Sequence, residues 1–338
     1  MRYEDRTGGF KSLGEFLVAA RKFCTGERLD NRLVKVMTEG VDSAGGVLVP
    51  EQSADELLMA SLGDAIVRPR ALVFDNLKSD TFNIPRFVET DRSSSLLGGM
   101  QFKWLEEAAD KSTIVSDPKF GNLKLTMHEG VISFWVSNQL EDDANNFEKF
   151  MKWALGKALA FYEDVYYIWG NGVGQPVGIM NSGAMLAPNR TAAGLINIQD
   201  IGIIGQRLLP GSHKNAVWLI NQDVIGQWVE MQSAAANAQS VINLSEMRCL
   251  GKDIIITDIC SALGTSGDII LADFSHYVIG QREIVIAASR HVPNYFQKNQ
   301  TFWKLWARID GQPTLTSAIT PYHGLNTVSP FVTLATSS

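Results

Sequence analysis

The chain has 338 residues, 45% of them hydrophobic, and a formal net charge of −6, so it is long and apolar enough for two domains, or one elaborated domain, with a sizeable core. It contains no run of about 18 apolar residues, and its first segment, MRYEDRTGGFK, has no apolar signal core, so we expect neither a membrane protein nor a secreted one. The acidic balance does not suit a protein that binds nucleic acid mainly by neutralising phosphates.

Residues 1–48 are predicted to form an arm without a core of its own. The segment GGFKSLGEFLVAARKF has apolar side chains at helical spacing, which predicts a short amphipathic helix with no local partner. These side chains are Phe10, Leu13, Phe16 and Leu17. Residues 1–35 carry eight basic and five acidic side chains, so this part is positive while the remainder of the chain is negative.

Two strand-forming regions follow, at residues 71–88 and 123–136, where Val, Ile, Phe and Trp are enriched. The segment between them is rich in Ser, Gly, Asp and Lys and has only scattered apolar residues. We interpret it as the tip of a long two-stranded excursion. Because an isolated hairpin is marginal in water, we expect this one to lie on another subunit.

Residues 146–169 give the strongest helix prediction, because their apolar residues recur at i, i+3, i+4 and i+7. Such a helix is about 36 Å long. The Gly-rich segment WGNGVGQPVGIM comes after the helix, whose negative dipole end repels phosphate, and its glycines do not make GxGxxG. We therefore predict that it ends the helix and leads to the next domain.

Residues 176–290 alternate between helix and strand patterns and predict a compact α/β unit, which makes the whole chain α+β. The last long segment, TFWKLWARIDGQP, is predicted to be a strand that returns to an earlier sheet. Its aromatic and basic residues alternate, but a stacking platform for nucleic acid needs both kinds on one face. We do not expect that arrangement here, and we interpret the segment as a buried or interface strand.

No catalytic, cofactor or metal site is predicted. The five histidines make no HxH or HxxxH pair, and the three cysteines (Cys24, Cys249, Cys260) make no CxxC pair. Asp273 and His276 lie close enough to suggest an α/β hydrolase, but the chain has no GxSxG nucleophile elbow. We therefore assign both residues structural roles.

The order of these segments resembles the major capsid protein of tailed bacteriophages, with its Hong Kong 97-like fold. Five motifs in the same order carry the resemblance: GGFKSLGEFL, GGVLVPEQ, the helix leading into GNGVGQPVGIM, GDIILADFSHYVIGQR, and RIDGQPT. The resemblance covers nearly the whole chain. It implies the following regions: N-arm 1–48, P-domain part 49–74, E-loop 75–125, P-domain with spine helix 126–175, A-domain 176–290, P-domain strand 291–310, and a return to the A-domain at 311–338.

The resemblance also implies a function. The chain would assemble as hexamers and pentamers into an icosahedral head that encloses the double-stranded DNA of a tailed phage or prophage, built in the host bacterial cytoplasm. The arm side chains Phe10, Leu13, Phe16 and Leu17 would contact neighbouring subunits. Scaffold, maturation protease, portal and decoration proteins would be its partners, with no cofactor, no enzyme activity and no membrane. An encapsulin-type compartment, the hydrolase, and a nucleic-acid-binding protein that uses the positive arm remain alternatives.

Some members of this family crosslink an E-loop lysine to an asparagine of a neighbour. Lys111 lies where that lysine would lie, and Asn294 or Asn299 could accept it. The reaction needs a carboxyl group to move protons, and the strand segment NQTFWKLWAR has none; Asp310 comes only after it. We therefore predict a shell without covalent crosslinks.

Overall fold

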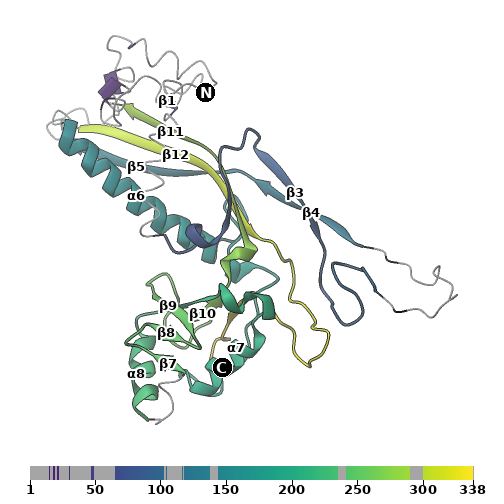
Figure 1. Cartoon of the computed structure of the whole chain (residues 1–338). Helices are drawn as coiled ribbons and strands as arrows, with labels where there is room; N and C mark the ends of the chain where they lie inside the picture. The colour runs from purple at the N-terminus through teal and green to yellow at the C-terminus, as the bar shows by residue number, and fades with distance from the viewer. Residues whose placement is uncertain are drawn as a thin grey trace.

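The computed structural model describes residues 15, 18–19, 21–22, 30, 47–48, 65–102, 104, 116, 118–137, 144–234, 241–289 and 300–337. These residues form an elongated molecule of mixed helix and sheet (Figure 1). A sheet with one long helix makes up one end, a compact α/β unit makes up the other, and a two-stranded hairpin projects to the side. The α+β class predicted from the sequence is confirmed.

The sheet at the first end has five strands, in the order β1-β11-β12-β5 with β2 paired to β11. Their bounds are β1 Val47–Leu48, β2 Leu72–Phe74, β5 His128–Ser137, β11 Tyr277–Ser289 and β12 Gln300–Pro313. Strands β11 and β12 run antiparallel over their whole length, from Tyr277 opposite Pro313 to Ser289 opposite Phe302. The prediction that TFWKLWARIDGQP returns to an earlier sheet is therefore confirmed.

Helix α6 (Ala144–Trp169) lies along this sheet (Figure 1). Its 26 residues give a length of about 39 Å, and it begins two residues before the predicted start. Met151, Leu155 and Ile168 are buried along one stripe, as the 3.6-residue period requires.

The Gly-rich segment after α6 turns the chain. Gly170 donates to the Tyr166 carbonyl at 2.8 Å, and Gly178 donates back to the Gly170 carbonyl at 2.8 Å. A Cβ on Gly170 would lie 2.1 Å from the Pro176 carbonyl oxygen, so only glycine fits there. Asn181 donates its side-chain amide to the Trp169 carbonyl at 2.7 Å, which satisfies one of the free carbonyls at the helix end. The segment ends the helix, as predicted.

The α/β unit is built on a six-stranded sheet in the order β13-β10-β6-β9-β8-β7. Its strands are β6 Val217–Ile220, β7 Ile242–Asn243, β8 Arg248–Cys249, β9 Lys252–Ile256, β10 Ile269–Ala272 and β13 Phe331–Thr333. Its helices are η3 Ile179–Asn181, α7 Ile198–Arg207, η4 Pro210–Lys214, α8 Val224–Ala234 and η6 Phe274–His276. Strands β6 and β10 are buried throughout, and Trp218 packs edge-on against Trp228 at 6.3 Å between ring centroids.

The hairpin consists of β3 (Thr81–Phe87) and β4 (Phe120–Thr126), which pair antiparallel. Near its base, Leu123 and Leu125 are buried against Val278 of β11. This finding corrects the expectation that the whole excursion needs another subunit, because its own chain covers the inner part. Phe87 and Phe120, at the outer ends of the two strands, are exposed.

The change of sheet does not coincide with the boundary that the sequence places at residue 290. Strand β11 was grouped with the 176–290 unit, but it pairs with β12 in the five-stranded sheet. The chain leaves the α/β sheet at η6, just before Tyr277. The hydrophobic run from Gly267 therefore contains two strands in different sheets. The remaining boundaries of the named regions stay predictions.

Candidate functional site

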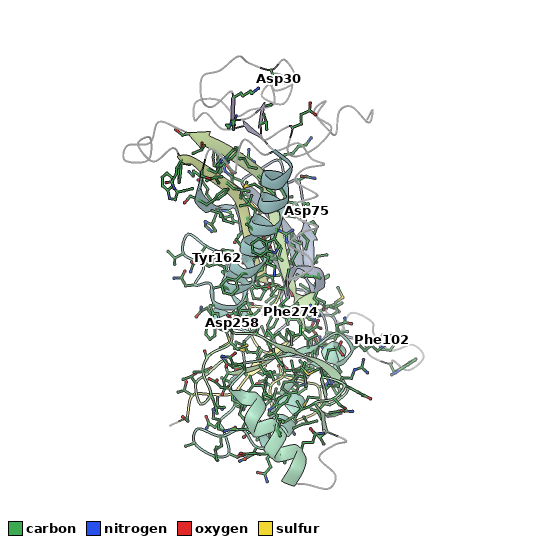
Figure 2. The ribbon with its side chains drawn as sticks, turned by 90° about the vertical axis from the view of Figure 1, so that its left-hand side faces the viewer. Asp30, Asp75, Phe102, Tyr162, Asp258 and Phe274 are labelled. Atoms are coloured by element: carbon green, nitrogen blue, oxygen red, sulfur yellow. The ribbon has the colours of Figure 1, made fainter. Side chains whose placement is uncertain are left out.

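The outer end of the hairpin exposes large apolar side chains to solvent. Phe102 is 79% exposed and Trp104 is 90% exposed, and their rings meet edge-on at 5.1 Å. Phe120 on β4 is also exposed, and Figure 2 shows Phe102 projecting away from the body of the molecule. Large apolar side chains that are exposed close to one another are typical of an interaction surface.

The base of the hairpin is fixed to the sheet by polar contacts. Asp310 of β12 accepts the Thr126 backbone N–H at 2.7 Å, and Gln312 donates to the Lys124 carbonyl at 2.6 Å. Burial raises the pKa of Asp310, and the N–H groups of Thr126 and Gly311 oppose that rise. This carboxyl group is thus engaged in holding the hairpin.

A second contact supports the hairpin farther out. Arg92 donates its backbone N–H to the Thr320 carbonyl at 2.9 Å, and Thr320 donates to the Thr90 carbonyl at 2.9 Å. The Arg86 guanidinium also donates to the Thr314 carbonyl. The segment between β12 and β13 therefore lies against the hairpin, and the apolar end extends beyond both supports.

Strand β12 presents different side chains on its two faces. Trp303, Leu305 and Ala307 are buried. Leu305 and Ala307 line a cleft of 470 Å³ together with Leu159 and Tyr162 of α6. The opposite face is half-exposed. It carries Phe302, Lys304, Trp306 and Arg308.

The half-exposed face of β12 combines rings and cations. Trp135 of β5 stacks on Phe302 with ring centroids 4.3 Å apart, and the Lys304 ammonium lies 4.8 Å from the Trp306 ring centroid. Our reason for rejecting a stacking platform was therefore wrong, because rings and cations do share one face. The alternative interpretation, an interface strand, agrees with this exposure.

A buried polar junction fixes the lower end of α6. Arg68 in η1 (Arg68–Arg70) donates to Glu163 of α6 at 2.9 and 3.1 Å and to Gln281 of β11 at 2.6 Å. Burial lowers the pKa of Arg68, but the attraction of Glu163, Tyr167 and Asp75 together with the hydrogen bond to Glu163 outweighs it, so the net shift is upward. This ion pair joins three elements that are far apart in sequence.

The neighbouring Asp164 adds to the same junction. Its carboxylate accepts the backbone N–H groups of Ile66 at 2.7 Å and Val67 at 2.9 Å. Burial is the main cause that raises the pKa of Asp164 to about 6, while the two N–H groups oppose it. The segment before η1 is thus attached to α6 through one titratable group.

The structure does not arrange Asp273 and His276 as a hydrolytic site. Ser275 donates its hydroxyl directly to Asp273 at 2.7 Å, and His276 Nε2 lies 3.9 Å from the other oxygen of Asp273. A triad needs the histidine between the serine and the acid. Asp273 instead accepts the Ser275 N–H and caps η6, as its predicted structural role requires.

Among the described residues, no three His, Cys, Asp or Glu side chains come together as a metal site, and no helix is both long and apolar enough to span a membrane. Burial raises the pKa of both Cys249 and Cys260 to about 12, which makes their thiols poor nucleophiles.

Several predicted site residues lie outside the described residues. They are the arm side chains Phe10, Leu13, Phe16 and Leu17, the lysine Lys111, and the acceptors Asn294 and Asn299. Sequence reasoning missed Phe102 and Trp104. Two aromatic residues within the otherwise polar tip could have indicated an apolar contact there.

Comparison with known proteins gives consistent results. The model of the phage capsid family matches residues 45–324. The capsid of a native GTA particle is similar in structure, with a TM-score of 0.59 and 18% identity over 89% of this chain and 95% of that one.

Phage structures resemble the chain as well. A structure of Mycobacterium phage Adephagia has a TM-score of 0.52 and 15% identity, covering 81% of this chain and 90% of that one. One of Gordonia phage Cozz has a TM-score of 0.54 and 11% identity, covering 81% and 87%. A search of curated proteins finds no significant match.

Proposed function

Because the chain belongs to the phage capsid family and is a capsid shell protein, we propose that it is the major head protein of a tailed phage or prophage. In this proposal it assembles as hexamers and pentamers that close into an icosahedral shell around double-stranded DNA. Assembly takes place in the host bacterial cytoplasm, with scaffold, maturation protease, portal and decoration proteins as further partners. The domain boundaries predicted from the sequence belong to the same proposal.

The observation that carries the proposal is the exposed end of the hairpin. Phe102 and Trp104 are almost fully exposed on a hairpin whose base is held by hydrogen bonds. A single subunit gains nothing from presenting these rings to water, whereas a neighbouring subunit can bury them. Similar structures include the capsid of a native GTA particle, which supports assembly of the chain into a shell.

The half-exposed face of β5 and β12 is the surface that such a hairpin fits best. It offers the rings of Trp135, Phe302 and Trp306, with Lys304 and Arg308 among them. The hairpin sequence WLEEAAD, from Trp104 onward, brings apolar and acidic side chains together. Shared aromatic character favours contact between these two surfaces of neighbouring copies, whereas Lys304 and Arg308 already have acidic partners in their own subunit, Glu129 at 3.8 Å and Asp80 at 3.1 Å.

In this proposal the packaged DNA lies inside the shell without sequence-specific recognition by the chain. We propose no enzymatic role, because Asp273 is occupied by Ser275 in the cap of η6.

The test is to express the full chain with and without its scaffold partner and to measure particle size by sedimentation and electron microscopy. We expect closed shells or capsomer rings. Replacing Phe102 and Trp104 by Asp should block assembly while the far-ultraviolet circular dichroism remains that of the folded chain. The matched control, Phe102→Tyr with Trp104→Phe, should assemble. A compact monomer at high concentration would refute the proposal.

We also propose that the shell is held by non-covalent contacts alone. Asp310, the nearest acid after NQTFWKLWAR, already binds two backbone N–H groups at 2.7 and 2.8 Å. Boiled in detergent, mature particles should therefore run as one band near 37.2 kDa. A ladder of larger species that disappears in Lys111→Ala would contradict this.

A further inference from the structure

The segment between β12 and β13 presents an apolar tip on a rigid support. Ile319 and Val328 exchange backbone hydrogen bonds of 2.8 and 2.9 Å, and both side chains are buried with Leu209. Beyond this closed neck, Tyr322 is 66% exposed and Leu325 is fully exposed. A side chain that is apolar, exposed and held on a fixed loop is suited to insert into another surface.

A groove of 660 Å³ lies between α6 and β9. Its apolar lining includes Phe161 and Ile256, which are 44% and 43% exposed, and the partly buried Ile66 and Ile259. Two large side chains that remain half-exposed inside a concave surface indicate that its occupant comes from outside the subunit.

The apolar tip and the groove lie on opposite edges of the molecule. Figure 1 shows α6 and β9 on the left, whereas the yellow segment after β12 projects on the right. Figure 2 looks at the left-hand edge, where Tyr162 and Asp258 are labelled one above the other. Two different surfaces on opposite edges are what a head-to-tail ring requires, because each copy then uses both.

One charged group at the groove has a polar counterpart at the tip. Among the described residues that line the groove, Asp258 and Lys157 are exposed, whereas Asp164 is buried and its carboxylate binds the N–H groups of Ile66 and Val67. The segment 314–330 contains no acidic residue, carries His323 beside the apolar tip, and is contacted by Arg207, which donates to the Thr327 carbonyl at 3.2 Å. His323 beside the tip and Asp258 at the groove therefore form one polar pair that accompanies the apolar contact.

We propose that Tyr322 and Leu325 of one copy insert into the α6–β9 groove of the next copy, and that this contact closes the capsomer ring. Leu325 then packs against Phe161 and Ile256, while His323 faces Asp258. The inference rests on the proposed shell function but adds to it a specific contact within one ring. It is separate from the contact of the hairpin end, which involves the other surface of the sheet.

The test uses crosslinking between introduced cysteines. Leu325→Cys and Ile256→Cys are combined in a Cys24→Ser background, in which the remaining Cys249 and Cys260 are buried. Assembled protein is treated with a short bismaleimide and analysed on denaturing gels. We expect a ladder of species up to the size of the ring, and no ladder from either single variant. Leu325→Cys with Val173→Cys is the control, since Val173 is also exposed but lies outside the groove.

The outcomes separate this inference from the shell function. Shells that form but give no ladder would overturn the ring contact and leave the shell function intact. Protein that forms neither rings nor shells would refute both. As a second measurement, Leu325→Asp should reduce assembly roughly tenfold or more, as expected for loss of a central apolar anchor. Normal assembly of this variant would also overturn the inference.

Discussion

Replacing Glu163 by Gln tests whether the buried ion pair fixes α6 to η1. Arg68 and Glu163 are only 4% and 6% exposed and are joined by hydrogen bonds of 2.9 and 3.1 Å. Removing one charge from a buried pair typically costs about 3–5 kcal/mol, because the other charge is left uncompensated. Gln281 and the more distant Asp75, at 3.6 Å, still contact Arg68. We therefore expect the lower end of this range, about 3 kcal/mol.

The assay is denaturant unfolding of the full-length, unassembled subunit at neutral pH. The control replaces both partners, Arg68→Met with Glu163→Leu, and it should lose much less than Glu163→Gln, since apolar residues of similar volume can replace a buried pair at little net cost. A loss below about 1 kcal/mol for Glu163→Gln would show that water reaches the junction. A double variant as unstable as the single one would show that shape, and not charge, matters there.

Three further results are expected. Folding raises the pKa of Asp164 from 3.8 to about 6, so between these two pH values the native state holds a proton that the unfolded state has lost. The free energy of unfolding should therefore fall by up to about 3 kcal/mol as the pH rises through this window. In pH-dependent unfolding, Asp164→Asn should flatten this slope. Gly311→Ala places a Cβ 2.8 Å from the Tyr277 ring and 3.0 Å from the Tyr167 ring, so it should lower the free energy of unfolding by about 1–3 kcal/mol. Gly226→Ala in α8 meets no atom within 4 Å and should raise it by about 0.5–1 kcal/mol, and the opposite order of the two variants would contradict this packing.

Elements with a strong period could be predicted from the sequence. The pattern at residues 146–169 predicted α6 to within two residues, and the segment TFWKLWARIDGQP predicted the strand that became β12. In both elements one face is buried, so apolar residues recur in the sequence with the period of a helix or of a strand. The Gly-rich turn was also predictable, because the order of helix and glycines excludes a phosphate site.

Contacts between distant segments could not be predicted. Nothing near Arg68 in sequence indicates Glu163, since the two are 95 residues apart and meet only when η1 packs on α6. The same is true of β11: only the short segment from Asp273 to His276 separates it from β10, and nothing in that segment indicates that the two strands belong to different sheets. The alternation of side chains along β12 predicts that the strand has two different faces, but it does not predict which elements cover each face. Burial of Trp303 and the partial exposure of Trp306 become visible only in the folded chain.

The separation between buried polar groups and exposed apolar ones has a consequence for assembly. Inside the subunit, Glu163 and Asp164 have hydrogen-bond partners from their own chain. At the edges, Trp104 and Leu325 extend beyond the contacts that hold their segments. We therefore expect that folding of the subunit does not depend on these edge side chains, and that contact between neighbouring copies does depend on them. Variants at the edges should change assembly without changing the stability of the subunit, whereas variants at the junction should lower that stability first.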